Sequence, residues 1–300
     1  MVRAMRCGVL MAGLTALLGT SCGISSQAAT PGGRIEVVAA ENFWGSIAAQ
    51  LGGDRVEVTS IITSPNTDPH AYEATPHDAR LIATAGLLIE NGAGYDAWVS
   101  ELASASPSAH RLVLDLGDLN GVPVGGNPHL WYSPAFVATA VDRITADLTQ
   151  LDATGASYFE ELRSAYQTAA LKAYLETIAT IHQKYRGTPI GASESMFAYL
   201  SPALGLDLIT PPGFMKAISE GSDPSVADRA AADEQLKGRL VRVFVYNPQN
   251  SSPDVLSLVK RARANGIPVV QMTETLSPAN LTFQEWQTNQ LRSLLGALGG

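Results

Sequence analysis

Four side chains of this sequence combine metal-ligand chemistry with a position in a predicted loop: His70, His129, Glu194 and Glu274. Two imidazoles and two carboxylates suit a first-row divalent ion, because they offer hard oxygen and borderline nitrogen donors together. Each histidine follows a proline, which holds the approaching backbone extended and helps to preorganise a site carried on loops. These residue types therefore indicate one bound transition-metal ion.

Each of the four residues has an ordinary explanation when it is taken alone. A single loop histidine is more often a surface or hydrogen-bonding residue than a ligand. A single glutamate after a strand is usually a favourable charge at a helix N-terminus. The hypothesis of a metal site rests on their distribution, because His70 and His129 belong to the first half of the chain and Glu194 and Glu274 to the second. A clamp between two lobes requires such a distribution.

Strand-like and helix-like segments alternate along the chain. We expect strands at 34–40, 56–62, 87–90, 111–116, 189–192, 207–210, 240–246 and 268–272. We expect helices at 44–51, 76–85, 95–103, 134–151, 196–204, 225–237, 253–265 and 283–298, and a Pro/Gly-rich loop at 211–224. This alternation predicts βαβ units and parallel sheets, in which ligands bind beyond the carboxyl ends of the strands.

A long segment without a helix breaker, residues 158–186, keeps apolar residues near one helical face and ends at Gly187. We therefore predict an α/β fold with two Rossmann-like lobes, whose parallel sheets are joined by one long interlobe helix. The predicted boundaries are an N-terminal α/β lobe at 34–155, a connecting helix at 156–187 and a C-terminal α/β lobe at 188–300.

The N-terminus has the features of a bacterial signal segment. Arg3 and Arg6 precede an apolar run, 7–18, that is too short to span a bilayer. Residues 18–22 (LGTSC) resemble a lipobox, with glycine at the place of the usual leucine. We predict a signal peptide at 1–21, and a lipidated Cys22 with a flexible tether at 22–33. The protein would then be extracytoplasmic and lipid-anchored to the outer face of the bacterial cell membrane; simple secretion is the alternative.

Composition excludes several classes of protein. The chain has 300 residues, 46% of them hydrophobic, which is enough for two domains with cores of their own. Its formal charge is −8 without a Lys/Arg cluster, which argues against nucleic-acid binding. No HExxH, GxSxG or P-loop motif is present, so the commonest enzyme signatures are missing. We expect a monomer that is not an enzyme.

The segments around the four residues resemble the family of ABC-transporter solute-binding lipoproteins for zinc, manganese and iron. Residues 68–72 (DPHAY) match its first motif, and 127–134 (NPHLWYSP) are similar to its Asp-Pro-His-x-Trp-x-Asp-Pro motif, with Asn127 and Ser133 replacing both acids. Residues 193–199 (SESMFAY) and 273–275 (TET) look like its third and fourth ligand sites. The replaced acids flank His129, so the orientation of this histidine is in question.

The resemblance implies the ligand set His70, His129, Glu194 and Glu274, the two-lobed fold with a rigid interlobe helix, and an ABC permease as partner. The transported ligand would be one divalent ion, Mn²⁺ or Zn²⁺, with Fe²⁺ as a further candidate. A glutamate at position 194 and a loop at 116–127 without histidine favour Mn²⁺ or Fe²⁺. The Irving–Williams order instead favours tight binding of Zn²⁺.

Two other functions stay open from the sequence. A metallohydrolase would need an open metal position and a general base, and a surface adhesin could use the same fold. Trp44, Trp98, Trp131 and Trp286 are interpreted as packing residues.

Overall fold

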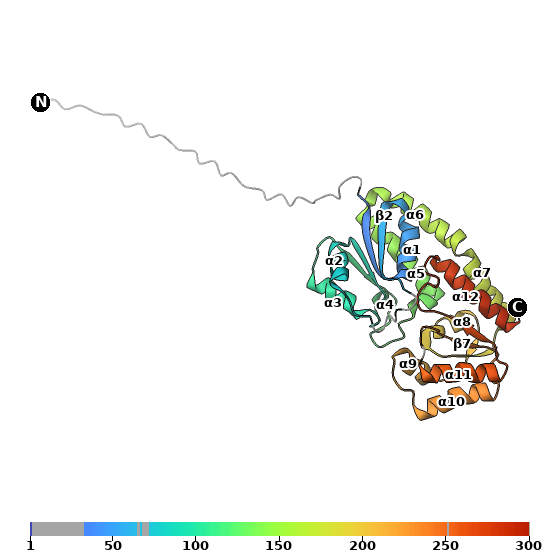
Figure 1. Cartoon of the computed structure of the whole chain (residues 1–300). Coiled ribbons are helices and arrows are strands. Elements are labelled where there is room, and N and C mark those ends of the chain that lie inside the picture. Colours follow the sequence, from blue (N-terminus) through green and yellow to red (C-terminus); the bar gives the residue numbers. More distant parts are fainter. Residues whose placement is uncertain (2–32, 65–66, 68–71, 251, 300) are drawn as a thin grey trace. The chain divides into compact units, whose positions relative to one another are not determined.

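The computed structural model describes residues 1, 33–64, 67, 72–250 and 252–299 (Figure 1). Cys22, His70 and the predicted signal segment after Met1 lie outside the described residues. The chain from Gly33 onward forms one compact unit. In the described part of the chain, no helix has both the length and the apolar character needed to cross a membrane.

The first half of the chain forms a parallel sheet of four strands in the order β2-β1-β3-β4. The strands are β1 (Ile35–Glu41), β2 (Val56–Ile62), β3 (Leu87–Glu90) and β4 (Leu112–Asp115). Alternate residues of β1 enter two separate clusters: Val37 packs with α1 and α5, and Val38 packs with α2 and α3. Strand β1 is apolar on both faces because helices cover both faces of the sheet.

The helical elements of this half connect and cover these strands. They are α1 (Asn42–Gly52), η1 (Gly53–Arg55), α2 (Pro76–Thr84), α3 (Ala97–Ala105), α4 (Leu116–Leu119), η3 (Leu130–Tyr132), α5 (Pro134–Leu151) and η4 (Ala153–Gly155).

The second half forms another parallel sheet of four strands, in the order β6-β5-β7-β8. The strands are β5 (Pro189–Ala192), β6 (Asp207–Leu208), β7 (Phe244–Tyr246) and β8 (Val269–Gln271). Numbered within each half, the strands of both sheets therefore follow the same order, 2-1-3-4. The order reverses between β1 and β3 and between β5 and β7, and ligands of doubly wound sheets bind at such reversals. The α/β class with two parallel sheets, predicted from the sequence, is confirmed.

Helices also cover both faces of the second sheet. The elements are η6 (Ser195–Ala198), α8 (Leu200–Ala203), α9 (Pro212–Ser219), α10 (Val226–Lys237), α11 (Pro253–Ala264) and α12 (Phe283–Leu298). Phe244 of β7 packs with α9, α10 and α11, while Val245 faces the cluster that contains α12. In Figure 1, α10 and α11 lie side by side, and α12 lies along α7.

The segment between the two sheets is helical but is not one regular α-helix. It consists of α6 (Ala156–Ala165), the π-helical turn η5 (Tyr166–Ala170) and α7 (Lys172–Tyr185). A π turn holds more residues than an α turn. It rotates the following helix, so that Leu171 and Tyr174 are buried in the same cluster as Tyr166. The apolar periodicity of the sequence did not reveal this local change of pitch.

Helix α9 lies inside the segment 211–224 that the sequence analysis predicted as a loop, so that prediction was wrong. Proline is well tolerated in the first turn of a helix, because its missing N–H has no partner there in any case. Pro212 occupies this place, and Phe214, Met215 and Ile218 bury one face of the helix. The predicted helix 196–204 is split into η6 and α8, and the strands predicted at 207–210 and 240–246 are shorter than expected.

The helix starts show why the boundaries of long helices could be predicted closely. Helix α12 begins at a capping box, in which Thr282 and Glu285 satisfy each other's backbone N–H groups. Helix α5 begins with Ser133 as its N-cap and Pro134 in its first turn. Both helices have the bounds that the sequence predicted.

One apolar core extends from the first sheet to the second. Phe43 of α1 stacks on Trp131 with ring centroids 4.1 Å apart and also lies 6.5 Å from Trp286 of α12. Trp44, Trp131 and Trp286 are buried in this core, which confirms their interpretation as packing residues. The two sheets are therefore joined by packed side chains and not only by the chain between them.

Three carboxyl groups are buried near the carboxyl end of the first sheet: Glu41, Glu90 and Asp96. Burial raises the pKa of Glu90 to about 7 and the pKa of Asp96 to about 6, and neighbouring carboxylates add to both shifts. Burial, and then the charge of Asp96, raise the pKa of Glu41 well above its usual value. These groups therefore bind protons more tightly in the folded than in the unfolded protein.

A carboxyl group with a raised pKa in the folded state makes the protein less stable as the pH rises from the unfolded pKa to the folded one. For Glu90 this window runs from about pH 4.3 to about pH 7. We expect Glu90→Gln to increase the free energy of unfolding at pH 8 by up to about 4 kcal/mol, at about 1.4 kcal/mol per pKa unit. At pH 5, where Glu90 is protonated, the change should be small.

Denaturant unfolding of the wild type and of Glu90→Gln at pH 5 and at pH 8 measures the change in the free energy of unfolding at each pH. Glu101→Gln, at an exposed position of helix α3, is the matched control and should change the free energy of unfolding at neither pH. An equal effect of Glu90→Gln at the two pH values would contradict the assignment of the raised pKa to Glu90.

Candidate metal centre

Three polar side chains follow neighbouring strands of the second sheet. Glu194 lies two residues after β5, Asn247 directly after β7, and Glu274 three residues after β8. Because β5, β7 and β8 are adjacent and parallel, their carboxyl ends meet at one edge of the sheet. The structure brings together the two glutamates that the sequence predicted.

His129 comes from the other half of the chain. It directly precedes the 3₁₀ turn η3, whose residues Leu130, Trp131 and Tyr132 are all buried. Next to η3, Ser133 caps helix α5. The backbone that carries the imidazole is therefore fixed on its C-terminal side by packing and by a helix start.

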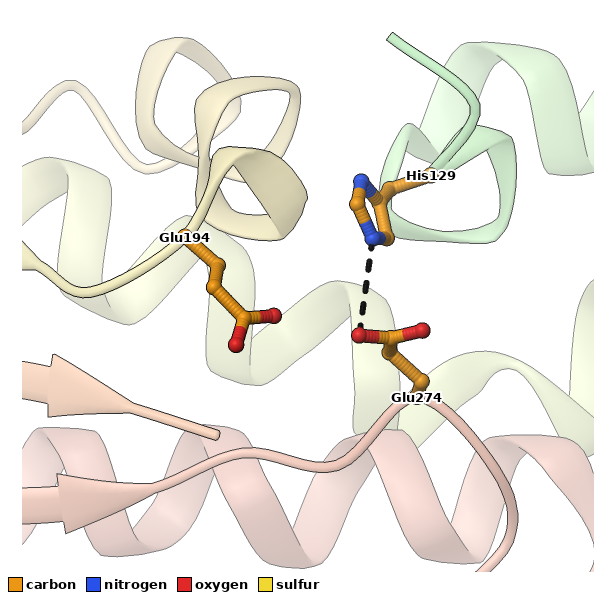
Figure 2. A group of neighbouring side chains, drawn as sticks. All are labelled: His129, Glu194 and Glu274. Atoms are coloured by element: carbon orange, nitrogen blue, oxygen red, sulfur yellow. Dashed lines mark ion pairs between the residues drawn. The ribbon is translucent and has the colours of Figure 1, made fainter. Parts of the chain in front are cut away.

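The side chains of His129, Glu194 and Glu274 converge on one point (Figure 2). One ligand atom from each lies within 4.8 Å of the other two. His129 Nε2 lies 3.7 Å from Glu274 Oε1. The three residues are only 0%, 1% and 4% exposed, respectively. Three of the four predicted ligands thus form one buried group, and His70 lies outside the described residues.

Asn127 orients the imidazole. Its Oδ1 accepts a hydrogen bond from the backbone N–H of His129 at 3.2 Å and lies 2.8 Å from His129 Nδ1. An amide oxygen can only accept, so His129 Nδ1 carries a proton, and Nε2 is the ring nitrogen that faces the glutamates and can ligate a metal. His129 Nδ1 therefore has a hydrogen-bond partner although Asn127 stands where the family motif has an acid.

The two carboxylates share a donor. Asn247 Nδ2 donates to Glu274 Oε1 at 2.8 Å and to Glu194 Oε2 at 3.2 Å. Tyr95 donates its hydroxyl to Glu274 Oε2 at 2.9 Å, and the backbone N–H of Glu274 donates to Gln249 Oε1 at 2.6 Å. Glu194 Oε1 is buried and accepts no hydrogen bond from the described residues.

Burial, and then the charge of Glu274, raise the pKa of Glu194 well above its usual value. Two carboxylates that face each other away from water cannot both ionise unless a positive charge lies between them. The pair must therefore share a proton or bind a cation. The imidazole nitrogen beside the pair is a ligand type that transition metals favour, so the group fits a divalent metal ion.

Tyr95, Asn247 and Gln249 contact the glutamates of the candidate site, and the sequence analysis missed them. Asn247 could have been predicted from the sequence, because it directly follows a predicted strand. Glu194 and Glu274 also follow strands, at two and three residues' distance. It was missed because the search was confined to side chains that ligate metals or titrate. Tyr95 and Gln249 had no signal of this kind, since only the folded chain brings them to Glu274.

We expect Asn247→Asp to destabilise the metal-free protein, because it removes the donor shared by Glu194 and Glu274 and buries a third carboxyl group beside them. Breaking a buried, compensated arrangement costs about 3 kcal/mol or more in the free energy of unfolding. Denaturant unfolding of chelator-treated protein measures this loss. Asn289→Asp, at an exposed position of α12, is the control and should change stability by less than about 0.5 kcal/mol. Equal effects of the two variants would contradict the role of Asn247.

A family model described as "Zinc-uptake complex component A periplasmic" (ZnuA) matches residues 37–297. The manganese-binding lipoprotein MntA of Halalkalibacterium halodurans is 26% identical over 207 residues, which cover 65% of this chain and 66% of that protein. The high-affinity zinc uptake system protein ZnuA of Bacillus subtilis is 24% identical over 79% of each chain. The iron-binding protein YfeA of Yersinia pestis is 28% identical over 57% of each chain.

Solved structures share the fold. An Mn-bound periplasmic metal binding protein from Candidatus Liberibacter asiaticus superposes with a TM-score of 0.72 and 19% sequence identity, covering 88% of this chain and 99% of that chain. A crystal structure of ZnuA superposes with a TM-score of 0.71 and 20% identity over the same shares. Identities this low carry the fold alone.

Proposed function

The chain belongs to the ZnuA family of periplasmic zinc-uptake components, and we propose that it is an extracytoplasmic receptor that captures one divalent transition-metal ion and delivers it to an ABC importer. The observation that carries this proposal is the buried convergence of His129, Glu194 and Glu274 from opposite halves of the chain. We assign these three side chains as ligands of the ion, with His70 as the fourth.

Burial of the ligands suits capture and transport. The three described ligands are at most 4% exposed, so a bound ion would be largely removed from water. Its charge would also relieve the repulsion between Glu194 and Glu274, which supplies a driving force for binding. Because His129 comes from one half and the glutamates from the other, release requires the two halves to separate or the loops to move. A permease that contacts both halves could cause such a change.

The ligand set supports Mn²⁺ or Zn²⁺ as cargo, with Fe²⁺ as a further candidate. Two carboxylates make the site harder than a histidine-rich one and favour Mn²⁺ or Fe²⁺, whereas the Irving–Williams order favours Zn²⁺. Relatives named for manganese, zinc and iron all match this chain. The proposal therefore concerns a divalent transition metal as a class, and transport preference depends also on which ion is available.

A receptor fits the site better than a metallohydrolase. A catalytic metal keeps a coordination position open for water, near a general base. Here Asn247, Tyr95 and Asn127 hold the described ligands, and none of these neighbours is a base at neutral pH. We therefore propose that the protein is not an enzyme.

The remaining assignments follow from the sequence. We propose a lipid anchor at Cys22 after removal of residues 1–21, a tether at 22–33, and a monomer that meets its permease at the outer face of the cell membrane. We also propose lobe boundaries at 34–155 and 188–300, with the helical segment 156–187 between them. Support comes from relatives whose names describe lipoproteins and uptake-system proteins.

Loss of a ligand should weaken metal binding. We expect His129→Ala, Glu194→Gln and Glu274→Gln each to lower the affinity for Zn²⁺ and Mn²⁺ by about 100-fold or more, since even residues behind the ligands are worth about 10- to 100-fold. Isothermal titration of chelator-treated protein measures the affinities, and competition between Zn²⁺ and Mn²⁺ ranks the ions. His110→Ala, at an exposed position, is the matched control. Wild-type affinity in the ligand variants would refute the proposed site.

Metal binding should also stabilise the fold. A ligand that binds only the folded state adds about 4 kcal/mol to the free energy of unfolding when its free concentration is 1,000 times its Kd. We expect the Tm to rise when Zn²⁺ or Mn²⁺ is added, to fall after chelation, and to respond much less in Glu194→Gln. Differential scanning calorimetry measures these shifts. A Tm that ignores both metal and chelator would contradict a clamp between the two halves.

A further inference from the structure

Asn127 contacts both halves of the molecule. On its own side it holds His129 through Oδ1, which accepts the backbone N–H at 3.2 Å and lies 2.8 Å from the ring Nδ1. Across the interface its Nδ2 donates to the backbone carbonyl of Ser195 at 2.8 Å. Tyr199 donates its hydroxyl to the carbonyl of Asn127 at 3.0 Å. One residue therefore joins the segment that carries His129 to the segment that carries Glu194.

The partners of Asn127 determine which side of its amide is oxygen. The backbone N–H of His129 can only donate, so the atom facing it must accept. The carbonyl of Ser195 can only accept, so the atom facing it must donate. An amide meets both requirements at once. A carboxylate of the same shape would support His129 but would place an anionic oxygen against the carbonyl of Ser195.

The contacted segment is itself fixed beside a ligand. Ser195 directly follows Glu194, and its backbone N–H donates to Ser219 Oγ of α9 at 3.1 Å. Lys216 of the same helix donates to the carbonyl of Gly125 at 3.3 Å, which fastens the loop before Asn127 to α9. The Asn127–Ser195 hydrogen bond is thus at the centre of a set of contacts that hold the two halves together next to the metal centre.

Charge favours the amide as well. Glu194 and Glu274 carry two negative charges when both are ionised, which balance one divalent ion. An aspartate at position 127 would add a negative charge beside a buried group that is already balanced, and an uncompensated buried charge is costly. A neutral residue that both accepts and donates meets the needs of this position.

We propose that Asn127 is a positioning residue whose amide couples the ring orientation of His129 to closure of the second half over the bound ion. This inference rests on the proposed function. The oxygen of the amide keeps a proton on His129 Nδ1, so that Nε2 is the ring nitrogen presented to the metal. The nitrogen of the amide slows release of the metal, because the hydrogen bond to Ser195 must break before the halves separate.

The two roles can be separated in the full mature chain with two variants. Asn127→Asp keeps the acceptor for His129 and removes the donor to Ser195, whereas the Asn127→Ala/Ser195→Ala double variant removes both. Nitrogen-15 NMR of the metal-free protein reports the tautomer of His129, and chelator trapping reports the dissociation rate of Zn²⁺. Asn120→Asp is the matched control, because Asn120 makes the same kind of bond within its own segment, to the carbonyl of Leu116.

We expect Asn127→Asp to keep the proton on Nδ1 and to release Zn²⁺ about 10-fold faster. Asn127→Ala combined with Ser195→Ala, which also removes the hydroxyl that lies 3.3 Å from His129 Nδ1, should shift the proton toward Nε2 and release Zn²⁺ at least as fast, while Asn120→Asp should match the wild type. A wild-type release rate in Asn127→Asp, or an unchanged tautomer in the Asn127→Ala/Ser195→Ala double variant, would overturn the proposal. Should the double variant fail to fold, the isosteric Asn127→Asp decides alone. A wild-type chain that binds neither Zn²⁺ nor Mn²⁺ would instead refute the proposed function.

Discussion

Two carboxylates that face each other out of reach of water, Glu194 and Glu274, are the constraint on which the rest of the site depends. Like charges in a buried position destabilise a protein unless a proton, a cation or strong donors compensate them. Asn247 compensates in part, because its amide donates to both carboxylates. The negative charge that Asn247 does not compensate would favour binding of a positive ion, and the nearby imidazole nitrogen would favour a transition metal over a hard ion such as Mg²⁺.

A site for one ion needs a rigid support, because its side chains must stay within bonding distance of the same point. The apolar core provides this support. Trp131 lies two residues after His129 in the sequence, and its ring stacks on Phe43 of α1, which in turn stacks on Trp286 of α12. Tyr132 donates its hydroxyl to the carbonyl of Thr273, next to Glu274. The residues that place the ligands are thus continuous with the packing that joins the two sheets, in agreement with the general need of a site for a fixed surrounding shell.

The sequence predicted the parts of this structure that depend on local patterns. Helix α5 and strand β2 have the predicted bounds, because their periodicity, caps and turn residues are all local. Glu194 and Glu274 were predicted because ligands collect at the carboxyl ends of parallel strands. Helix α9 was missed because Pro212 and Gly213 are typical of a loop unless their neighbours are known to be buried. The π-helical turn η5 and the donors Tyr95 and Gln249 depend on tertiary packing, which no local pattern contains.

Replacement of acids by Asn127 and Ser133 gains a physical reason when the charges around His129 are considered together. The side-chain amide of Asn91 donates to the carbonyl of Pro128, beside His129, while Asp96 holds the backbone N–H of Asn91. Burial, and then the charge of Asp96, raise the pKa of Glu41, and both residues belong to a group of buried acids in the first half. Glu194 and Glu274 contribute a second group from the other half. Asn127 and Ser133 each supply the acceptor that a carboxylate would supply at the same place: Asn127 accepts the backbone N–H of His129, and Ser133 accepts the backbone N–H of Phe136 as the N-cap of α5. Both positions therefore keep their hydrogen bond without adding a negative charge beside the buried carboxyl groups.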